Sequence, residues 1–307
     1  MYAATLTHAD RPPVYTTLPE PTPGPGQIAV DVLAAGLHHL TRGRATGQHY
    51  SNGVSLPLTP GVDGVVRDET GTLRYVVLDD TAAGTFAERT VIDPARSVVL
   101  PEGIDPVVIA AAMNPAMSSW VALRRRIEFP AGARVLVTGA TGASGRLAVQ
   151  IAKLLGAGHV IAAGRNRTRL EELRDLGADQ LIGLDEFEAA ADADVVLDYL
   201  WGAPAASALI PMLTRRRDRS APLTWVQIGS MAGDTAPIPG AALRSSHLQI
   251  VGSGIGSVPA RDLVAELPAI AEALSSGALR TQAHAVPLRE IEHYWDAPSV
   301  ERIVFVP

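Results

Sequence analysis

Cysteine is absent from this 307-residue chain, and lysine nearly so. Without a thiol the chain can form no disulfide, no thiolate nucleophile and none of the zinc sites that use cysteine ligands. Lys153 is the only lysine, and the remaining basic side chains are arginines. A mechanism that needs a catalytic lysine would therefore have to use Lys153.

A basic surplus and a long apolar run are also missing. The chain has 26 Lys and Arg against 32 Asp and Glu, so a phosphate-binding surface for nucleic acid is not expected. No run approaches about 18 uninterrupted apolar residues, and the opening MYAATLTHADRPPVY lacks an apolar core of the signal-peptide type. With 47% hydrophobic and 19% charged residues, the composition predicts a globular protein, which we expect in the cytoplasm without a membrane partner.

Two sequence patterns follow one another along the chain. The first hundred residues are rich in Pro, Gly and Thr, with short β-branched runs such as 28–33 and 76–78 between turn signals, which predicts a small β-rich domain. From about 134 to 252, short apolar runs alternate with amphipathic segments, which predicts a parallel sheet with crossover helices. The expected strands are 135–137, 160–163, 180–182, 195–197, 224–228 and 249–251. A helix over 263–275 and a strand over 302–306 are expected to return to the first domain.

The stretch RVLVTGATGASGRLAVQIAKLLG carries the strongest motif. An apolar strand leads into a loop with Gly139, Gly142, Ala143, Ser144 and Gly145, and apolar residues then recur at helical spacing until Gly156. Glycine permits a tight turn and lets the backbone approach a pyrophosphate, whose charge is met by free N–H groups and the positive end of the helix dipole. The pattern therefore predicts a dinucleotide site.

Cofactor choice depends on the end of the next strand. An NAD site places an acid about 20 residues beyond the glycines, where it binds the ribose 2′-hydroxyl. Here the chain reads Gly164-Arg165-Asn166-Arg167. Two guanidinium groups and an amide suit a 2′-phosphate, so the sequence favours NADPH over NADH. The alternative is that Arg165 and Arg167 are ordinary solvated charges.

The chain resembles the zinc-free quinone oxidoreductase branch of the medium-chain dehydrogenase/reductase superfamily. The matching stretches include PTPGPGQIAVDVLAAGLH, LPLTPGVDGVV, GTFAERTVI, VLVTGATGASGRLAVQIAKLLGA, DADVVLDYLWG and RIVFVP. The resemblance implies an α/β fold: a GroES-like β-rich catalytic domain over 1–113 and 253–307, and a Rossmann doubly wound parallel-sheet domain over 114–252. Zinc-dependent members carry Gly-His-Glu where this chain has Gly61-Val62-Asp63, and they use a cysteine ligand, so no metal is expected.

The same resemblance implies hydride transfer from NADPH to a small-molecule quinone or α,β-unsaturated carbonyl. Tyr50 matches a tyrosine that lies near the substrate in such enzymes, and we expect it to donate a hydrogen bond or a proton. His38 stands where relatives commonly have Asn and could be a second donor. Residues expected near the nicotinamide ribose and ring are Ile228, Gly229, Gly252 and Ser253. A homodimer through the sheet edge at 248–251 is also implied.

Region 66–84 departs from the family because it lacks several loop residues, and a shortened hairpin is expected there. Such a hairpin would give the substrate cleft a different wall from that of other family members. A serine hydrolase is not favoured because no G-x-S-x-G is present. A short-chain reductase is excluded because Val149 stands four residues before Lys153, where that family needs tyrosine. Two alternatives stay open: a non-catalytic NADPH-binding sensor, and an enoyl-thioester reductase whose carrier phosphates would be bound by 124–126 or 215–217.

Overall fold

The computed structural model describes residues 1–47, 55–78, 83–299 and 301–307 and divides the chain into two compact units. Unit 1 comprises Met1–Asn114 and Leu267–Pro307, and unit 2 comprises Pro115–Glu266. The chain passes from unit 1 to unit 2 within helix α2 (Pro106–Val121) and returns within α7 (Ala260–Ser275). The sequence-based boundaries follow residues 113 and 252, so the second of them lies before the start of α7.

Unit 2 is built on a six-stranded parallel sheet in the order β10-β9-β8-β11-β12-β13. Its strands are β8 (Arg134–Thr138), β9 (His159–Ala163), β10 (Gln180–Ile182), β11 (Val195–Asp198), β12 (Leu223–Gln227) and β13 (Leu248–Gly252). Its helical elements are η2 (Ala122–Arg126), α3 (Ala143–Leu154), α4 (Arg167–Glu171), η3 (Arg174–Leu176), η4 (Phe187–Ala190), α5 (Gly202–Arg215) and α6 (Gly240–Arg244). All six predicted strands are confirmed. The order, with each crossover returning over the sheet, is that of a doubly wound Rossmann fold.

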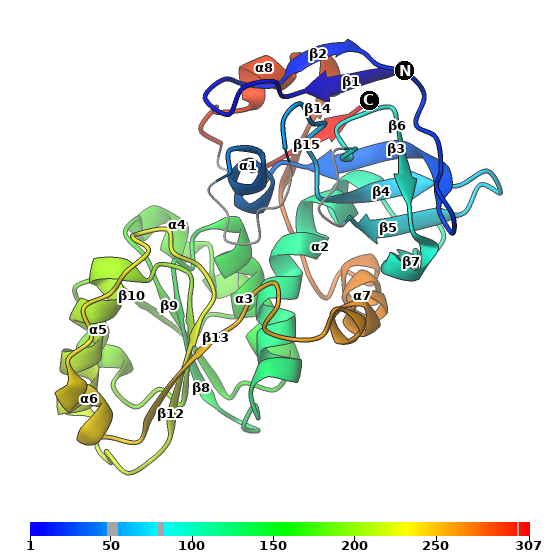
Figure 1. Ribbon diagram of the computed structural model, residues 1–307. Helices are drawn as coiled ribbons and strands as arrows, with labels where there is room; N and C mark the ends of the chain where they lie inside the picture. Colours follow the sequence, from blue (N-terminus) through cyan, green and yellow to red (C-terminus); the bar gives the residue numbers. More distant parts are fainter. Residues whose placement is uncertain (48–54, 79–82, 300) are drawn as a thin grey trace. The chain divides into compact units, whose positions relative to one another are not determined.

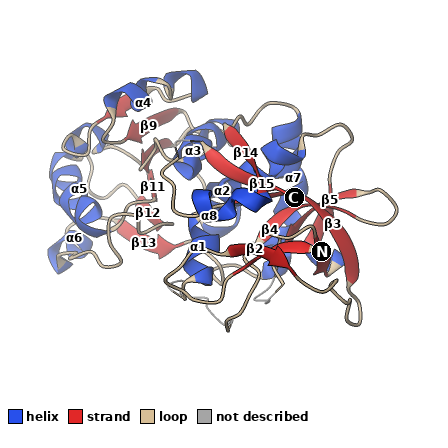
Figure 2. Ribbon diagram, turned by 90° about the horizontal axis from the view of Figure 1, so that it is seen from above, coloured by secondary structure: helices blue, strands red, loops and turns tan. Residues whose placement is uncertain are grey.

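Helices cover both faces of this sheet, with α3 on one face and α5 and α6 on the other (Figures 1 and 2). Burial on both faces explains why the strands are continuous apolar runs rather than alternating ones. Leu136, Ile161, Val196 and Trp225 are fully buried in the core beneath α5. The sheet's carboxyl edge, where loops leave the strands, is the edge at which such folds bind ligands.

Unit 1 contains a seven-stranded sheet, β14-β15-β3-β4-β5-β7 with β6 paired to β3, and a two-stranded sheet, β1-β2. The strands are β1 (Tyr2–Thr5), β2 (Val14–Thr17), β3 (Ile28–Gly36), β4 (Asp63–Arg67), β5 (Leu73–Val77), β6 (Arg89–Ile92), β7 (Ser97–Val99), β14 (Ala283–Pro287) and β15 (Arg302–Val306). The short helical elements are α1 (His39–Ala45), η1 (Pro94–Arg96), η5 (Leu288–Glu290) and α8 (Ile291–Tyr294). Strand β15 pairs with β3, and its Phe305 packs edge to face on Phe86 with the ring centroids 5.0 Å apart. Both ends of the chain thus share one core. The β-rich fold predicted by resemblance is confirmed.

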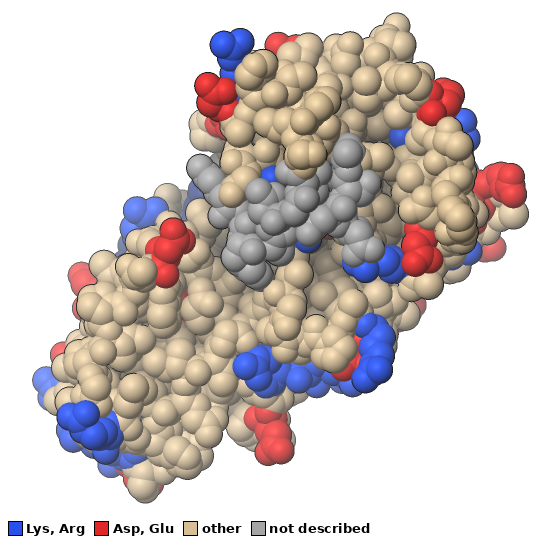
Figure 3. All heavy atoms as spheres, viewed as in Figure 1, with Lys and Arg blue, Asp and Glu red and all other residues tan. Residues whose placement is uncertain are grey.

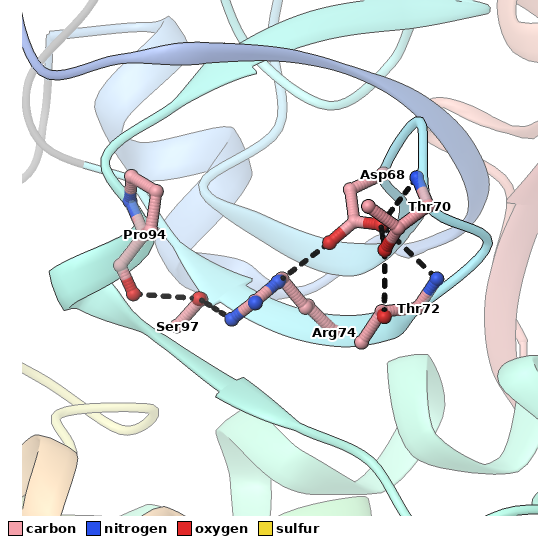
Figure 4. Close-up of polar contacts among 6 residues, drawn as sticks. All are labelled: Asp68, Thr70, Thr72, Arg74, Pro94 and Ser97. Carbon is pink, nitrogen blue, oxygen red and sulfur yellow. Dashed lines mark hydrogen bonds and ion pairs between the residues drawn. The ribbon is translucent and has the colours of Figure 1, made fainter.

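The hairpin expected in region 66–84 is formed by β4 and β5. Asp68 organises its turn: Oδ1 accepts from the N–H groups of Thr70 and Thr72, each at 3.0 Å, and from the Thr70 hydroxyl at 2.6 Å (Figure 4). Oδ2 accepts from Nε of Arg74 at 3.1 Å. These donors, the Thr70 hydroxyl foremost, lower the pKa of Asp68 to about 2. A charged carboxylate therefore holds this turn at neutral pH.

Helix α2 continues into η2 to form one helix over Pro106–Arg126, which by length and composition could cross a membrane. Within the most apolar 18-residue stretch of this helix, 72% is buried inside the protein. That burial is typical of a core helix, so its apolar character is accounted for by packing within the chain.

Candidate functional site

The glycine loop leaves β8 and enters α3 without room for side chains at two positions. Gly139 has φ +65°, a left-handed conformation that favours glycine. A Cβ on Gly145 would overlap the carbonyl oxygen of Gly139 and lie 2.6 Å from Cα of Ala140. Gly142 is the N-cap of α3 and has no side chain with which to cap that terminus.

Because Gly142 has no side chain to cap it, the first turn of α3 offers backbone N–H groups at the end of a helix of twelve residues. Ala143 and Ser144, the first two residues of the helix, contribute two of these groups. Free N–H groups and the positive end of a helix dipole are the features that bind anions such as a pyrophosphate. The predicted strand, loop and helix are confirmed, and α3 ends at Leu154 with Gly156 at φ +98°.

A buried carboxylate, Asp198 at the end of β11, holds the neighbouring loops at this edge. Its Oδ1 accepts from the hydroxyl of Thr138 at 2.6 Å and from the N–H groups of Leu200 and Trp201 at 2.9 and 3.1 Å. Its Oδ2 accepts from the indole N–H of Trp225 at 2.9 Å. The Asp198 side chain therefore joins β8, β11 and β12, a role that the sequence did not predict.

The residues after Asp198 form a constrained loop. Trp201 has φ 53° and ψ −154°, the only positive φ among the non-glycine residues that the structure describes. Backbone strain of this kind occurs disproportionately at functional sites. Tyr199 is buried beside Gly139, its hydroxyl lies 2.9 Å from that of Ser118, and burial raises its pKa to about 12. Its hydroxyl is thus protonated at neutral pH.

The second predicted contact loop, Gly164 to Arg167, follows β9. Gly164 is buried, and a Cβ there would lie 3.1 Å from Cγ2 of Thr141. Asn166 caps α4 by accepting from the N–H of Arg169 at 3.1 Å. Arg165 is exposed, whereas Arg167 forms a 2.7 Å ion pair with Glu186. The loop thus carries the two guanidinium groups and the amide predicted for a 2′-phosphate, and the guanidinium of Arg167 is already paired.

The residues predicted near the nicotinamide lie at the ends of β12 and β13. The N–H groups of Ile228 and Gly229 both donate to the carbonyl of Asp198, at 2.8 and 3.1 Å. A Cβ on Gly229 would lie 2.9 Å from the carbonyl oxygen of Tyr199. Gly252 ends β13, and the N–H of Ser253 donates to Gln227 at 2.8 Å. The fold therefore brings all four to the carboxyl edge that also carries the glycine loop.

Of the two catalytic candidates, the structure describes only His38, which belongs to unit 1. Tyr50 lies outside the residues that the structure describes. His38 is 4% exposed: its Nε2 lies 3.1 Å from Oδ1 of Asp63, and its Nδ1 accepts from the N–H of Thr41 at 3.4 Å, which caps α1. Tyr75 donates to the other oxygen of Asp63 at 2.7 Å. Both ring nitrogens of His38 are therefore engaged inside the unit.

Burial and the Asp63 carboxylate raise the pKa of Tyr75 well above its usual value, so its hydroxyl stays a donor. Arg302 donates from Nη1 to the carbonyl of Leu37 at 3.0 Å, and burial lowers its pKa to about 10. It therefore stays charged at neutral pH. Asp63 stands where zinc-dependent relatives have the Glu of their signature, and here it serves a buried hydrogen-bond network. Across the described part of the chain, no group of three or more His, Asp or Glu side chains is placed to hold a metal ion.

The two arginine runs are used largely within unit 2. Arg124 and Arg125 both donate from Nε to Glu266, at 2.7 and 2.6 Å, and the indole of Trp120 donates to the same carboxylate. Arg126 donates to the carbonyl of Gly252 at 2.7 Å.

In the second run Arg216 is buried on backbone carbonyls, whereas Arg215 and Arg217 pair with Glu188 and Asp192. On the face drawn in Figure 3, basic side chains gather in several separate groups, and acidic side chains lie beside most of them.

Comparison with known proteins extends over the whole chain. A family model described as zinc-binding dehydrogenase matches residues 143–273. A probable NADPH-dependent quinone reductase of Emericella nidulans is 31% identical, with all of both chains covered. A chloroplastic NADPH-dependent alkenal/one oxidoreductase of Arabidopsis thaliana is 29% identical over 57% of this chain and 50% of its own.

Among solved structures, the quinone oxidoreductase of Thermus thermophilus, also determined as its complex with NADPH, matches with TM-score 0.85 and 25% identity and covers 100% of both chains. The two-unit architecture, the glycine loop and the full-length similarity agree with one another. The chain therefore belongs to the medium-chain dehydrogenase/reductase superfamily, in its quinone-reductase-like branch.

Proposed function

We propose that this protein is a zinc-independent, NADPH-dependent reductase that transfers hydride to a quinone or to an α,β-unsaturated carbonyl compound. The observation that carries the proposal is the 31% identity, over the whole of both chains, to a probable NADPH-dependent quinone reductase. The glycine loop supplies the physical basis, because its uncapped helix terminus and the arginines after β9 fit a dinucleotide with a 2′-phosphate.

When bound, NADPH supplies a hydride from C4 of its nicotinamide. The chain's own task is then to hold the cofactor and substrate in line and to stabilise the oxygen on which negative charge develops. We propose that Gly139, Gly142, Ala143, Ser144 and Gly145 bind the pyrophosphate through their backbone. Residues proposed to bind the 2′-phosphate are Gly164, Arg165, Asn166 and Arg167, and those proposed to pass close to the nicotinamide are Ile228, Gly229, Gly252 and Ser253.

For the substrate oxygen we propose Tyr50 as the hydrogen-bond or proton donor. His38 stays a second candidate, but its burial and its contacts with Asp63 and Thr41 support a positioning role instead. A Tyr50→Phe variant separates the two: loss of kcat with unchanged NADPH affinity supports Tyr50. An unchanged kcat would show that another residue donates to the substrate oxygen.

The enoyl-thioester alternative required a basic groove for the carrier's phosphates. The candidate runs are engaged within unit 2, since Arg124 and Arg125 hold Glu266 and Arg216 is buried. That use favours an uncharged small-molecule substrate.

The test is consumption of NADPH with 1,2-naphthoquinone, with a simple enone and with crotonyl-CoA, each before and after EDTA treatment. Turnover of the quinone or enone that survives the chelator supports the proposal. Turnover of crotonyl-CoA alone would support the thioester alternative. NADPH binding without turnover across a broad acceptor panel would instead support a non-catalytic sensor.

We further propose a cytoplasmic homodimer that pairs through β13. This strand ends the six-stranded sheet, and its residues 249–252 are exposed or half-buried. An uncovered sheet edge is a template for strand pairing between copies. Size exclusion at low salt that gives only a monomer would reject the dimer.

A further inference from the structure

Two loops of unit 2 leave the carboxyl edge side by side. Strand β10 pairs with β9 in parallel, with Ile182 opposite Ala163, and the N–H of Gly164 donates to the carbonyl of Ile182 at 3.2 Å. The loop after β9 is the arginine loop proposed for the 2′-phosphate. The loop after β10 carries Asp185 and Glu186. Acidic groups thus lie next to the site proposed for a dianionic group.

Glu186 is fixed in place by the backbone and in turn holds Arg167. Its Oε2 accepts from the N–H of Gly183 at 2.6 Å and from Nη2 of Arg167 at 2.7 Å. Both donors lower the pKa of Glu186, with Gly183 as the larger cause, so the carboxylate is charged at neutral pH. A Cβ on Gly183 would lie 2.5 Å from Oδ1 of Asp185 and 3.1 Å from Nη2 of Arg167. The absence of a side chain at Gly183 leaves room for this arrangement.

The two arginines of the loop therefore differ in their surroundings. The Arg167 side chain, although 59% exposed, shares its charge with a carboxylate at hydrogen-bond distance. Arg165 is exposed and forms no ion pair with any residue in the described part of the chain.

We propose that Glu186 is a specificity-determining residue that weakens the preference for a 2′-phosphorylated cofactor by neutralising Arg167, so that Arg165 supplies most of the recognition of the 2′-phosphate. The inference rests on the proposed use of NADPH and assigns opposite roles to two neighbouring side chains.

The sign of the effect follows from Coulomb's law. A 2′-phosphate carries nearly two negative charges, and a carboxylate within a few ångströms repels it. The same carboxylate occupies one of the guanidinium nitrogens of Arg167. Removing the charge of Glu186 eliminates the repulsion and weakens its hold on Arg167, whereas a cofactor without the 2′-phosphate gains neither benefit. The preference should therefore rise.

The test is isothermal titration calorimetry of wild type and E186Q with 2′,5′-ADP and with ADP, which represent the adenosine half with and without a 2′-phosphate. Glutamine keeps an oxygen that can accept from Gly183, so the loop should be retained, and a thermal melt checks the fold. E188Q is the matched control: Glu188 is also exposed and paired with an arginine, Arg215, at 3.1 Å.

The expected result is that E186Q binds 2′,5′-ADP about three- to tenfold more tightly at low salt, with the gain shrinking as salt is added, while ADP affinity is unchanged. The double variant R167Q/E186Q should lose this gain. E186Q binding 2′,5′-ADP equally or more weakly would overturn the proposal, as would the same gain in E188Q.

Failure of the proposed NADPH dependence has a different signature: wild-type protein that binds ADP as tightly as 2′,5′-ADP. Even then, an E186Q variant that acquires the preference supports the role of Glu186. One that does not acquire it overturns the role.

Discussion

The hydroxyl of Thr138 donates a 2.6 Å hydrogen bond to Oδ1 of Asp198, and the two residues are register partners at the ends of β8 and β11. The bond therefore joins the strand that feeds the glycine loop to the strand that feeds the strained loop at Trp201. Both partners are buried, so water cannot replace either one. Charge-assisted bonds of this kind are among the strongest in proteins.

Asp198→Asn tests this junction. An amide nitrogen in place of Oδ2 would face the indole N–H of Trp225, donor against donor, or would face the hydroxyl and two N–H groups if the side chain turned over. We expect a loss of about 1–3 kcal/mol in the free energy of unfolding, measured in urea. The exposed Asp234→Asn is the control, and an equal loss there would contradict the assignment.

Gly145→Ala should disrupt the cofactor site through its backbone. The new Cβ meets the carbonyl of Gly139 and Cα of Ala140, and neither can move without shifting the loop. We expect NADPH affinity, measured by fluorescence titration, to fall by about tenfold or more, together with a lower Tm. Gly142→Ala is the steric contrast, because its Cβ would lie 3.5 Å from the nearest atom and φ is −77°. Equal Tm losses in the two variants would refute this explanation.

Arg216→Met should destabilise unit 2. Nη1 of Arg216 donates to the carbonyls of Ala191 and Ala193 at 2.8 and 2.7 Å, and Nη2 donates to Pro222 at 2.8 Å. Methionine fills much of the volume but leaves these buried acceptors without a donor, at a cost of about 2–4 kcal/mol. Arg217→Met, whose side chain is 90% exposed, should change the unfolding free energy by less than about 0.5 kcal/mol.

The Asp68 turn predicts an acid dependence of stability. The pKa of this carboxyl is about 2 in the folded chain and about 3.9 when unfolded, so its contribution is complete above about pH 5 and is lost progressively as the pH falls through about 2. The difference in Tm between wild type and Asp68→Asn should therefore be large at pH 7 and small at pH 2.5. Glu69→Gln, an exposed neighbour, should show no such trend. A difference that is constant with pH would exclude the charge as its cause.

The sequence predicted the fold closely wherever local pattern decides structure. The strand predicted over 180–182 coincides with β10, that over 302–306 with β15, and the helix predicted over 263–275 lies within α7. The glycine loop could be predicted for the same reason, because its strand, glycines and helix are adjacent in sequence. Apolar period and glycine spacing need no knowledge of distant partners.

What escaped prediction depends on pairs that are far apart in the chain. Thr138 and Asp198 are 60 residues apart, and Arg124 and Glu266 are 142 apart. An arginine run therefore looks the same in sequence whether it is free for a ligand or used within the fold. The Arg167–Glu186 pair spans only 19 residues, but it needs β9 and β10 to be neighbours.

The only lysine of the chain also forms an ion pair within the fold, since Nζ of Lys153 lies 2.6 Å from Oδ2 of Asp179. Asp179 in turn accepts from the N–H of Val160 at 2.6 Å, which fixes the amine against the start of β9. Amine-directed reagents thus find one side-chain target, and its acylation would report on the α3–β9 packing. With no native thiol, a single cysteine introduced at an exposed position would be the only one to label. A thiol-directed dye can therefore be attached at one chosen place without any residue being removed first.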